Sequence, residues 1–173
     1  MTTKIAAVAA VFALFSQAAL ANIDVAFIEG APKDRFVIKN TSSCELNNLT
    51  VDIDLTSTVG RLIFDTTSSG AGVEVFQPFE VTKGAIKVIS SDGVKDGDNK
   101  LSISIQSLPA SQYVSFTIDV DDTLVKSSRG NIIISGSEIE NGMVKVSSAT
   151  IDQAVGKFNS ASKASIALPA CKT

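Results

Sequence analysis

The chain has 173 residues and a formal net charge of −3, and it contains neither histidine nor tryptophan. Without histidine it cannot form a Ser-His-Asp or Cys-His catalytic arrangement, nor a histidine-based zinc site. The basic residues are scattered along the sequence, which argues against nucleic acid and against an anionic membrane surface as partners.

The first 21 residues have the three parts of a secretory signal peptide. Lys4 provides the positive start, residues 5–15 form an uncharged apolar stretch, and Ala19-Leu20-Ala21 matches the A-x-A cleavage pattern. The apolar stretch is too short to span a membrane, and no later segment is apolar for long enough. We therefore predict that residues 1–21 are a signal peptide. Residues 22–173 are then a single domain, exported to the periplasm or the medium, with no transmembrane span.

Apolar and polar residues alternate along most of the mature chain, a pattern typical of antiparallel strands that bury one face and expose the other to water. In chain order the predicted strands are 23–28, 34–40, 49–55, 60–64, 72–76, 84–89, 101–106, 114–120, 131–136, 142–147 and 163–168. No segment has sustained helical periodicity, and 150–160 is expected to hold at most a short helical turn. The pattern predicts an all-β fold. We expect a single antiparallel β-sandwich, immunoglobulin-like or jelly-roll, of about eight to ten strands.

Residues typical of turns separate these strands. Glu29-Gly30-Ala31-Pro32 lies between the first two, and residues 91–99 form a polar loop. Asn141-Gly142 is the strongest hairpin pattern in the chain, because both positions of a tight two-residue turn favour positive φ.

The two cysteines, Cys44 and Cys171, are an even pair in a chain with export features. Such a pair favours a disulfide over two free thiols. The bond would tie an early strand to the C-terminal tail. In the chain-entropy model a loop of this size stabilises the fold by about 4–5 kcal/mol.

Three aspartates crowd the end of the strand predicted at 114–120, in the stretch FTIDVDDT. Alternation places Asp119 and Asp121 on the same water-facing side, and Asp122 follows at the strand end. Like charges this close repel unless something neutralises them, and calcium binds carboxylate oxygens of this kind. Asp119, Asp121 and Asp122 are therefore candidate calcium ligands, and calcium is the one cofactor that the sequence suggests. The alternative is a solvated strand end without a metal.

A second acidic cluster lies in SDGVKDGDNK, with Asp92, Asp96, Asp98 and Asn99. It does not match the EF-hand loop, because other residues occupy the ligand positions. Aspartate is common in turns, where it accepts hydrogen bonds from nearby backbone. A polar turn is the favoured interpretation of this cluster.

The segment 70–84 combines a glycine-rich start with Phe76, Pro78 and Phe79. Proline is excluded from a central strand position. We expect a sandwich edge whose two rings close one end of the core, with an exposed aromatic patch for a partner as the alternative.

Four stretches, VAFIEGAPKDRFVIKNTSSCEL, LIFDTTSSGAGVEVFQPFEV, FTIDVDDT and the terminal LPAC, together resemble small exported proteins of marine and related bacteria. These are labelled aggregation factor core proteins, after the cell-adhesion complex of a marine sponge. The resemblance spans residues 23–171 and implies calcium-assisted adhesion. It supplies no catalytic residue and no known metal ligand, so the calcium assignment depends on the spacing of the three aspartates.

These observations favour a secreted or periplasmic, non-enzymatic module for binding or adhesion, which acts through sheet edges and loops and is assisted by calcium. The partner would be a cell-surface or matrix protein or a glycan. One alternative is a calcium-independent structural module that pairs through its sheet edges. Another is a hydrolase that uses a carboxylate pair, although sugar-cleaving sites usually stack rings on aromatics and this chain has one tyrosine.

Overall fold

The computed structural model describes residues 21–72, 76–90, 92–125 and 135–171. These residues form eleven strands and no helix. The strands are β1 (Ala21–Ile28), β2 (Asp34–Asn40), β3 (Leu46–Asp54), β4 (Ile63–Asp65), β5 (Glu80–Lys83), β6 (Ile86–Val88), β7 (Lys100–Leu108), β8 (Tyr113–Asp121), β9 (Met143–Ser148), β10 (Ile151–Lys157) and β11 (Lys163–Leu168). The predicted all-β class is confirmed, with one strand more than the expected upper number.

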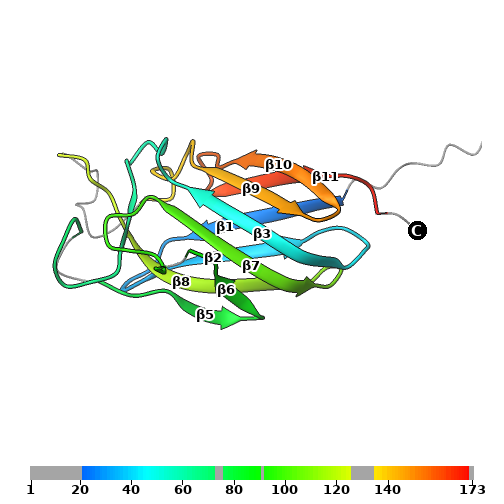
Figure 1. The fold of residues 1–173 in the computed structure, drawn as a ribbon. Coiled ribbons are helices and arrows are strands. Elements are labelled where there is room, and N and C mark those ends of the chain that lie inside the picture. The colour runs from blue at the N-terminus through cyan, green and yellow to red at the C-terminus, as the bar shows by residue number, and fades with distance from the viewer. Residues whose placement is uncertain (1–20, 73–75, 91, 126–134, 172–173) are drawn as a thin grey trace, which may run out of the picture.

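Two antiparallel sheets stack face to face as a β-sandwich (Figure 1). The first sheet has the order β11-β1-β2-β8-β4, with β5 also pairing with β8. The second sheet has the order β10-β9-β3-β7-β6. The end of β8 and the loop after β4 lie at one end of the sandwich, and the C-terminus lies at the other (Figure 1).

The core lies between the two sheets, and β8 shows how the sequence builds it. The apolar side chains of β8 (Val114, Phe116, Ile118 and Val120) are all buried, as the alternation predicts. The Phe116 ring stacks on Phe36 of β2 at a centroid distance of 5.1 Å. The Phe79 ring also packs against Phe116, at 4.8 Å, so this ring of the segment 70–84 lies against the core as expected.

The opposite face of β8 is also buried, which corrects the prediction that it faces water. Ser115, Thr117 and Asp119 are only 4–5% exposed. The reason is that β5 and the segment just before it run along β8. The Asp119 amide donates to the Gln77 carbonyl at 3.1 Å, and the Ser115 and Thr82 hydroxyls lie 2.7 Å apart.

Residues 150–160 hold no helix, and Ile151–Lys157 is instead the edge strand β10, which was not among the predicted strands. Most of its side chains are exposed, so it lacks the apolar alternation that marks the other strands. A Cβ at Gly156 would lie 2.9 Å from the carbonyl oxygen of Ser165 in β11. Glycine thus lets the two sheets approach closely along this side.

Three of the predicted strands either begin later in the structure or lie mostly outside the described residues. The strand predicted at 60–64 is β4, which begins at Ile63. Most of the segments 72–76 and 131–136 lies outside the described residues, while Phe76 and Ser135 are not in strands. Residues 136–141 form turns, and Asn141 has a φ of 75°. Gly142 does not have positive φ, so Asn141-Gly142 is not the predicted two-residue hairpin turn.

The structure contains the disulfide between Cys44 and Cys171, whose Cα atoms lie 5.9 Å apart. It links the turn between β2 and β3 to the C-terminal tail.

The predicted signal peptide lies outside the described residues except Ala21, the first residue of β1. Within the part of the chain that the structure describes, no helix has the length and apolar character needed to cross a membrane.

Candidate metal centre

Three buried aspartates meet where β8 pairs with the short strand β4. Asp65 lies directly opposite Asp119 in this ladder, and Asp121 lies two residues further along β8 on the same side. The three residues have exposures of 0%, 5% and 2% in the order Asp65, Asp119 and Asp121. One carboxylate oxygen from each lies within 4.8 Å of the others. We call these three residues the aspartate triad.

The spacing of the aspartate triad suits one calcium ion. Two oxygens bound to the same calcium at about 2.3–2.6 Å lie at most about 5 Å apart, since that is twice the bond length. Three carboxylates offer six oxygens, and calcium takes six to eight. Magnesium fits less well, because it usually keeps several waters and binds one or two carboxylates.

Asp65 is the residue that separates this cluster from an ordinary acidic surface. It is fully buried, and no N–H or hydroxyl of the described residues donates to either of its oxygens. The carboxylates of Asp96 and Asp121 lie against it, and that of Asp119 lies within 4.8 Å. Carboxylate oxygens in contact need a proton or a cation between them, so this arrangement requires one or the other.

The electrostatics of the triad favour proton uptake when no metal is bound. Burial, followed by the contacts with Asp96 and Asp121, raises the pKa of Asp65 to about 7. Burial followed by the charge of Asp121 raises the pKa of Asp119 to about 7. A divalent cation would replace these protons and remove the repulsion.

A loop closes over the triad and is held by Asp96. Its Oδ2 accepts a hydrogen bond from the Ala71 amide at 2.8 Å, and its Oδ1 accepts one from the Thr66 amide at 3.0 Å. Burial alone would raise the pKa of Asp96, but these amide donors outweigh it and lower the pKa. Asp96 is therefore the anionic anchor of the loop, next to Asp65.

Two glycines make this closure possible. A Cβ at Gly72 would overlap the carboxylate of Asp65, and a Cβ at Gly70 would overlap that of Asp96. Gly70 also has a φ of +141°, where other residues are strained. The glycine-rich start of the segment 70–84 therefore lets backbone approach the acidic cluster closely.

Asp34 adds a fourth buried carboxyl group beside the triad. Its Oδ1 accepts a hydrogen bond from the Gly30 amide at 3.0 Å and its Oδ2 one from the Val120 amide at 3.1 Å. Burial is the main cause that raises the pKa of Asp34 to about 8, with smaller contributions from the charges of Asp119 and Asp121. Its side chain therefore fastens the β1–β2 turn to β8, next to the candidate metal centre.

The structure places Asp122 outside the triad. Its side chain is 3% exposed, and its Oδ1 accepts a hydrogen bond from the Leu124 amide at 3.0 Å. Asp122 thus shapes the chain as it leaves β8. Of the three aspartates predicted from sequence, Asp119 and Asp121 converge with a residue that the sequence reasoning missed.

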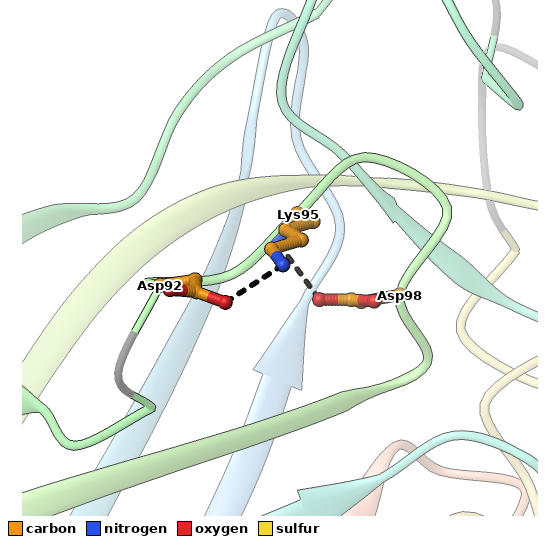
Figure 2. A network of polar contacts seen from close by, with 3 residues as sticks. All are labelled: Asp92, Lys95 and Asp98. Carbon is orange, nitrogen blue, oxygen red and sulfur yellow. Dashed lines mark hydrogen bonds and ion pairs between the residues drawn. The ribbon is translucent and has the colours of Figure 1, made fainter.

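The second acidic cluster is a polar turn, as expected. Figure 2 shows Lys95 between the two aspartates: its Nζ forms an ion pair with Asp92 at 2.9 Å, and its amide donates to Asp98 at 2.8 Å. Asp96 instead binds the loop after β4. These aspartates therefore do not converge on one point.

The comparisons with known proteins do not identify a family: no family model, curated protein or solved structure matches this chain.

Proposed function

We propose that this protein is an exported, non-enzymatic module for binding or adhesion, and that a calcium ion at the aspartate triad stabilises it. The proposal joins the signal-peptide features of residues 1–21 with the Cys44–Cys171 disulfide, which is typical of oxidising compartments. It also agrees with the resemblance to exported proteins that are labelled aggregation factor core proteins.

The observation that carries the calcium part is the convergence of Asp65, Asp119 and Asp121 in a buried position. Buried like charges destabilise a fold unless they are neutralised. A calcium ion at this point would join β4 and β8 to the loop that Asp96 anchors. It would thereby stiffen one end of the sandwich and the surface loops there.

The triad is less suited to hydrolysis. A catalytic carboxylate pair needs space for a substrate beside it, but the backbone at Gly72 lies against Asp65. Four open depressions on the described surface are lined by other residues. The burial that favours a bound ion therefore works against access by a substrate.

Pairing through sheet edges is also less favoured as the means of contact. The edge strands β4, β5 and β6 have only three or four residues each. Such short edges offer few free backbone groups to a partner strand. On the other side of the sandwich the edge strands β10 and β11 approach each other at Gly156. Sheet faces and loops remain as the larger binding surfaces.

The proposal is tested by thermal melting with calcium and with a chelator, together with binding of the labelled protein to cells from the native culture. Ligand binding to the folded state stabilises it by mass action, about 2.7 kcal/mol at a hundred times the Kd. We expect calcium to raise the melting temperature and to increase cell binding. A melting temperature that does not change with calcium would contradict the proposed calcium site. Absence of cell binding would contradict the proposed adhesive function.

A further inference from the structure

The face of the first sheet that points away from the core gathers basic residues that are far apart in sequence. Arg35 and Lys39 project from β2, Lys83 from β5 and Lys163 from β11, and all four are exposed. We call this surface the basic face. It shows that the basic residues, scattered in the sequence, are not all scattered in space.

The strand register fixes the order of side chains across the basic face. One row crosses five neighbouring strands and consists of Lys163, Ala26, Val37, Ser115 and Lys83. The next row crosses four of these strands and consists of Ser165, Asp24, Lys39 and Tyr113. Each row thus runs across the sheet with polar or charged ends and, in the first row, an apolar middle.

The four cations of the basic face are available to a ligand. None of the three ion pairs found among the described residues includes them. Two carboxylates border them, but each has a partner: Asp24 accepts a hydrogen bond from the Ser165 hydroxyl at 2.7 Å, and Glu80 pairs with Lys33. The local excess is positive on a protein whose net charge is −3.

The only tyrosine of the chain also lies on this face. Tyr113 is 41% exposed, and the Nζ of Lys83 lies 3.5 Å from the centre of its ring. An exposed aromatic ring held beside a cation offers an apolar surface and a positive charge at one position.

Two open depressions, of about 480 Å³ and about 470 Å³, adjoin on the basic face and share Val37. The first is bordered by Lys39 and Lys163, and the second by Arg35, Lys83 and Tyr113. Together they form a shallow track across the strands, with an apolar floor and cations along its borders.

We propose that the basic face binds an acidic polysaccharide along this track. A sugar ring has an apolar face, which suits Val37 and the Tyr113 ring, and hydroxyl groups, which suit the exposed Ser165. The anionic groups of successive sugars would contact the lysines and Arg35. This inference rests on the proposed binding function, since it names the class of partner and the surface that meets it.

Other polyanions fit this surface less well. Peptides that bind sheets usually add a strand at a free edge, whereas β1, β2 and β8 are each paired on both sides. Single-stranded nucleic acid usually needs several stacked aromatic rings, and the basic face has Tyr113 alone. The single exposed ring among cations therefore favours a sugar polymer.

The test measures binding of the full mature protein, in calcium, to immobilised hyaluronan and chondroitin sulfate, with neutral dextran, polyglutamate and single-stranded DNA for comparison. Lys39→Gln/Lys83→Gln/Lys163→Gln removes three charges from the basic face. The matched control, Lys87→Gln/Lys95→Gln/Lys157→Gln, removes three exposed charges elsewhere on the protein. Tyr113→Ser removes the ring without changing the charge.

We expect one or both acidic polysaccharides to bind and dextran not to bind. Comparing the affinities for hyaluronan and chondroitin sulfate shows whether sulfate groups are needed. The basic-face variant should bind at least about tenfold more weakly, and the control within about twofold of the wild type, because charge complementarity is local. Binding should weaken as salt rises from about 50 to about 300 mM. Tyr113→Ser should weaken polysaccharide binding as well.

No polysaccharide binding by the wild type, or equal losses in the two triple variants, would overturn the proposal. Stronger binding to polyglutamate or DNA than to the polysaccharides would overturn the assignment of a sugar polymer and indicate another class of partner. The calcium-dependent melting and the cell binding are measured on the same proteins. If both persist while polysaccharide binding is absent, only this inference fails. If both are absent in the wild type, the proposed function itself fails.

Discussion

Asp65 and Asp119 lie directly opposite each other in the β4–β8 ladder, and both side chains are buried. Like charges at opposed positions of an antiparallel pair destabilise it. Asp121, which lies next to Asp119 on the same side of β8, adds a third carboxylate to this repulsion. The stability of this end of the sandwich should therefore depend on what neutralises the carboxylates.

The first prediction concerns Asp65→Asn. Without calcium this variant should be more stable than the wild type by about 1 kcal/mol, because one buried charge is removed from the cluster. In calcium it should lose most of the rise in melting temperature, since a ligand is missing. Differential scanning calorimetry with calcium and with a chelator measures both effects. Asp92→Asn is the control, since Asp92 is exposed and outside the triad. An unchanged calcium response in Asp65→Asn would contradict the assignment of this ligand.

The second prediction concerns pH. The pKa is raised to about 7 for Asp65 and Asp119 and to about 8 for Asp34, from a usual value of 3.8. The folded protein therefore holds more protons than the unfolded chain between pH 4 and 8, so the calcium-free protein should lose stability as pH rises through this range. Calcium competes with these protons, so its stabilising effect should grow from pH 5 to 8. Urea unfolding at several pH values, with and without calcium, gives both trends. A calcium-free protein that gains stability over the same range would contradict the raised pKa values.

The third prediction concerns the core. Phe116 is fully buried, and its ring contacts those of Phe36 and Phe79. Phe116→Ala should lower the free energy of unfolding by about 3–5 kcal/mol, because it removes buried surface and leaves a cavity. The exposed edge residue Val155 provides the comparison, and Val155→Ala should change stability by less than about 0.5 kcal/mol. Similar losses in the two variants, measured by chemical denaturation, would argue against the described core.

The fourth prediction concerns the Cys44–Cys171 disulfide, which spans 127 residues of sequence. Its removal should lower stability by up to about 4–5 kcal/mol, because the unfolded chain regains the entropy of an open loop. Melting with and without a reducing agent measures this loss. The double variant Cys44→Ser/Cys171→Ser should melt like the reduced wild type and should not respond to the reducing agent. Equal melting of the oxidised and reduced wild type would show that the bond does not restrain the fold.

Much of the fold could be predicted from the sequence because strand alternation is a local property. The alternation in β8 correctly assigned Phe116 to the core and Asp119 to the other face. It could not show that this other face is also covered, because the cover comes from the chain around Gln77 and Thr82, which is distant in sequence. The exposed edge strand β10 was missed because few of its residues contact the core.

The candidate metal centre could be predicted only in part, for the same reason. Asp119 and Asp121 share one strand, so their spacing follows from the strand period. Asp65 belongs to the three-residue strand β4, and its place opposite Asp119 depends on a long-range pairing that no local pattern contains. An aspartate that directly follows the apolar run Leu62-Ile63-Phe64 was the one sequence feature that marked it as a strand-end carboxylate.

The most direct test of the account is a calorimetric titration of calcium into the metal-free mature protein near neutral pH, with the variant Asp65→Asn/Asp121→Asn as comparison. We predict that one calcium ion binds per wild-type chain and that the variant, if folded by circular dichroism, binds none. Binding of calcium by the folded variant with wild-type affinity, or no calcium binding by the wild-type protein, would contradict a metal centre at Asp65, Asp119 and Asp121.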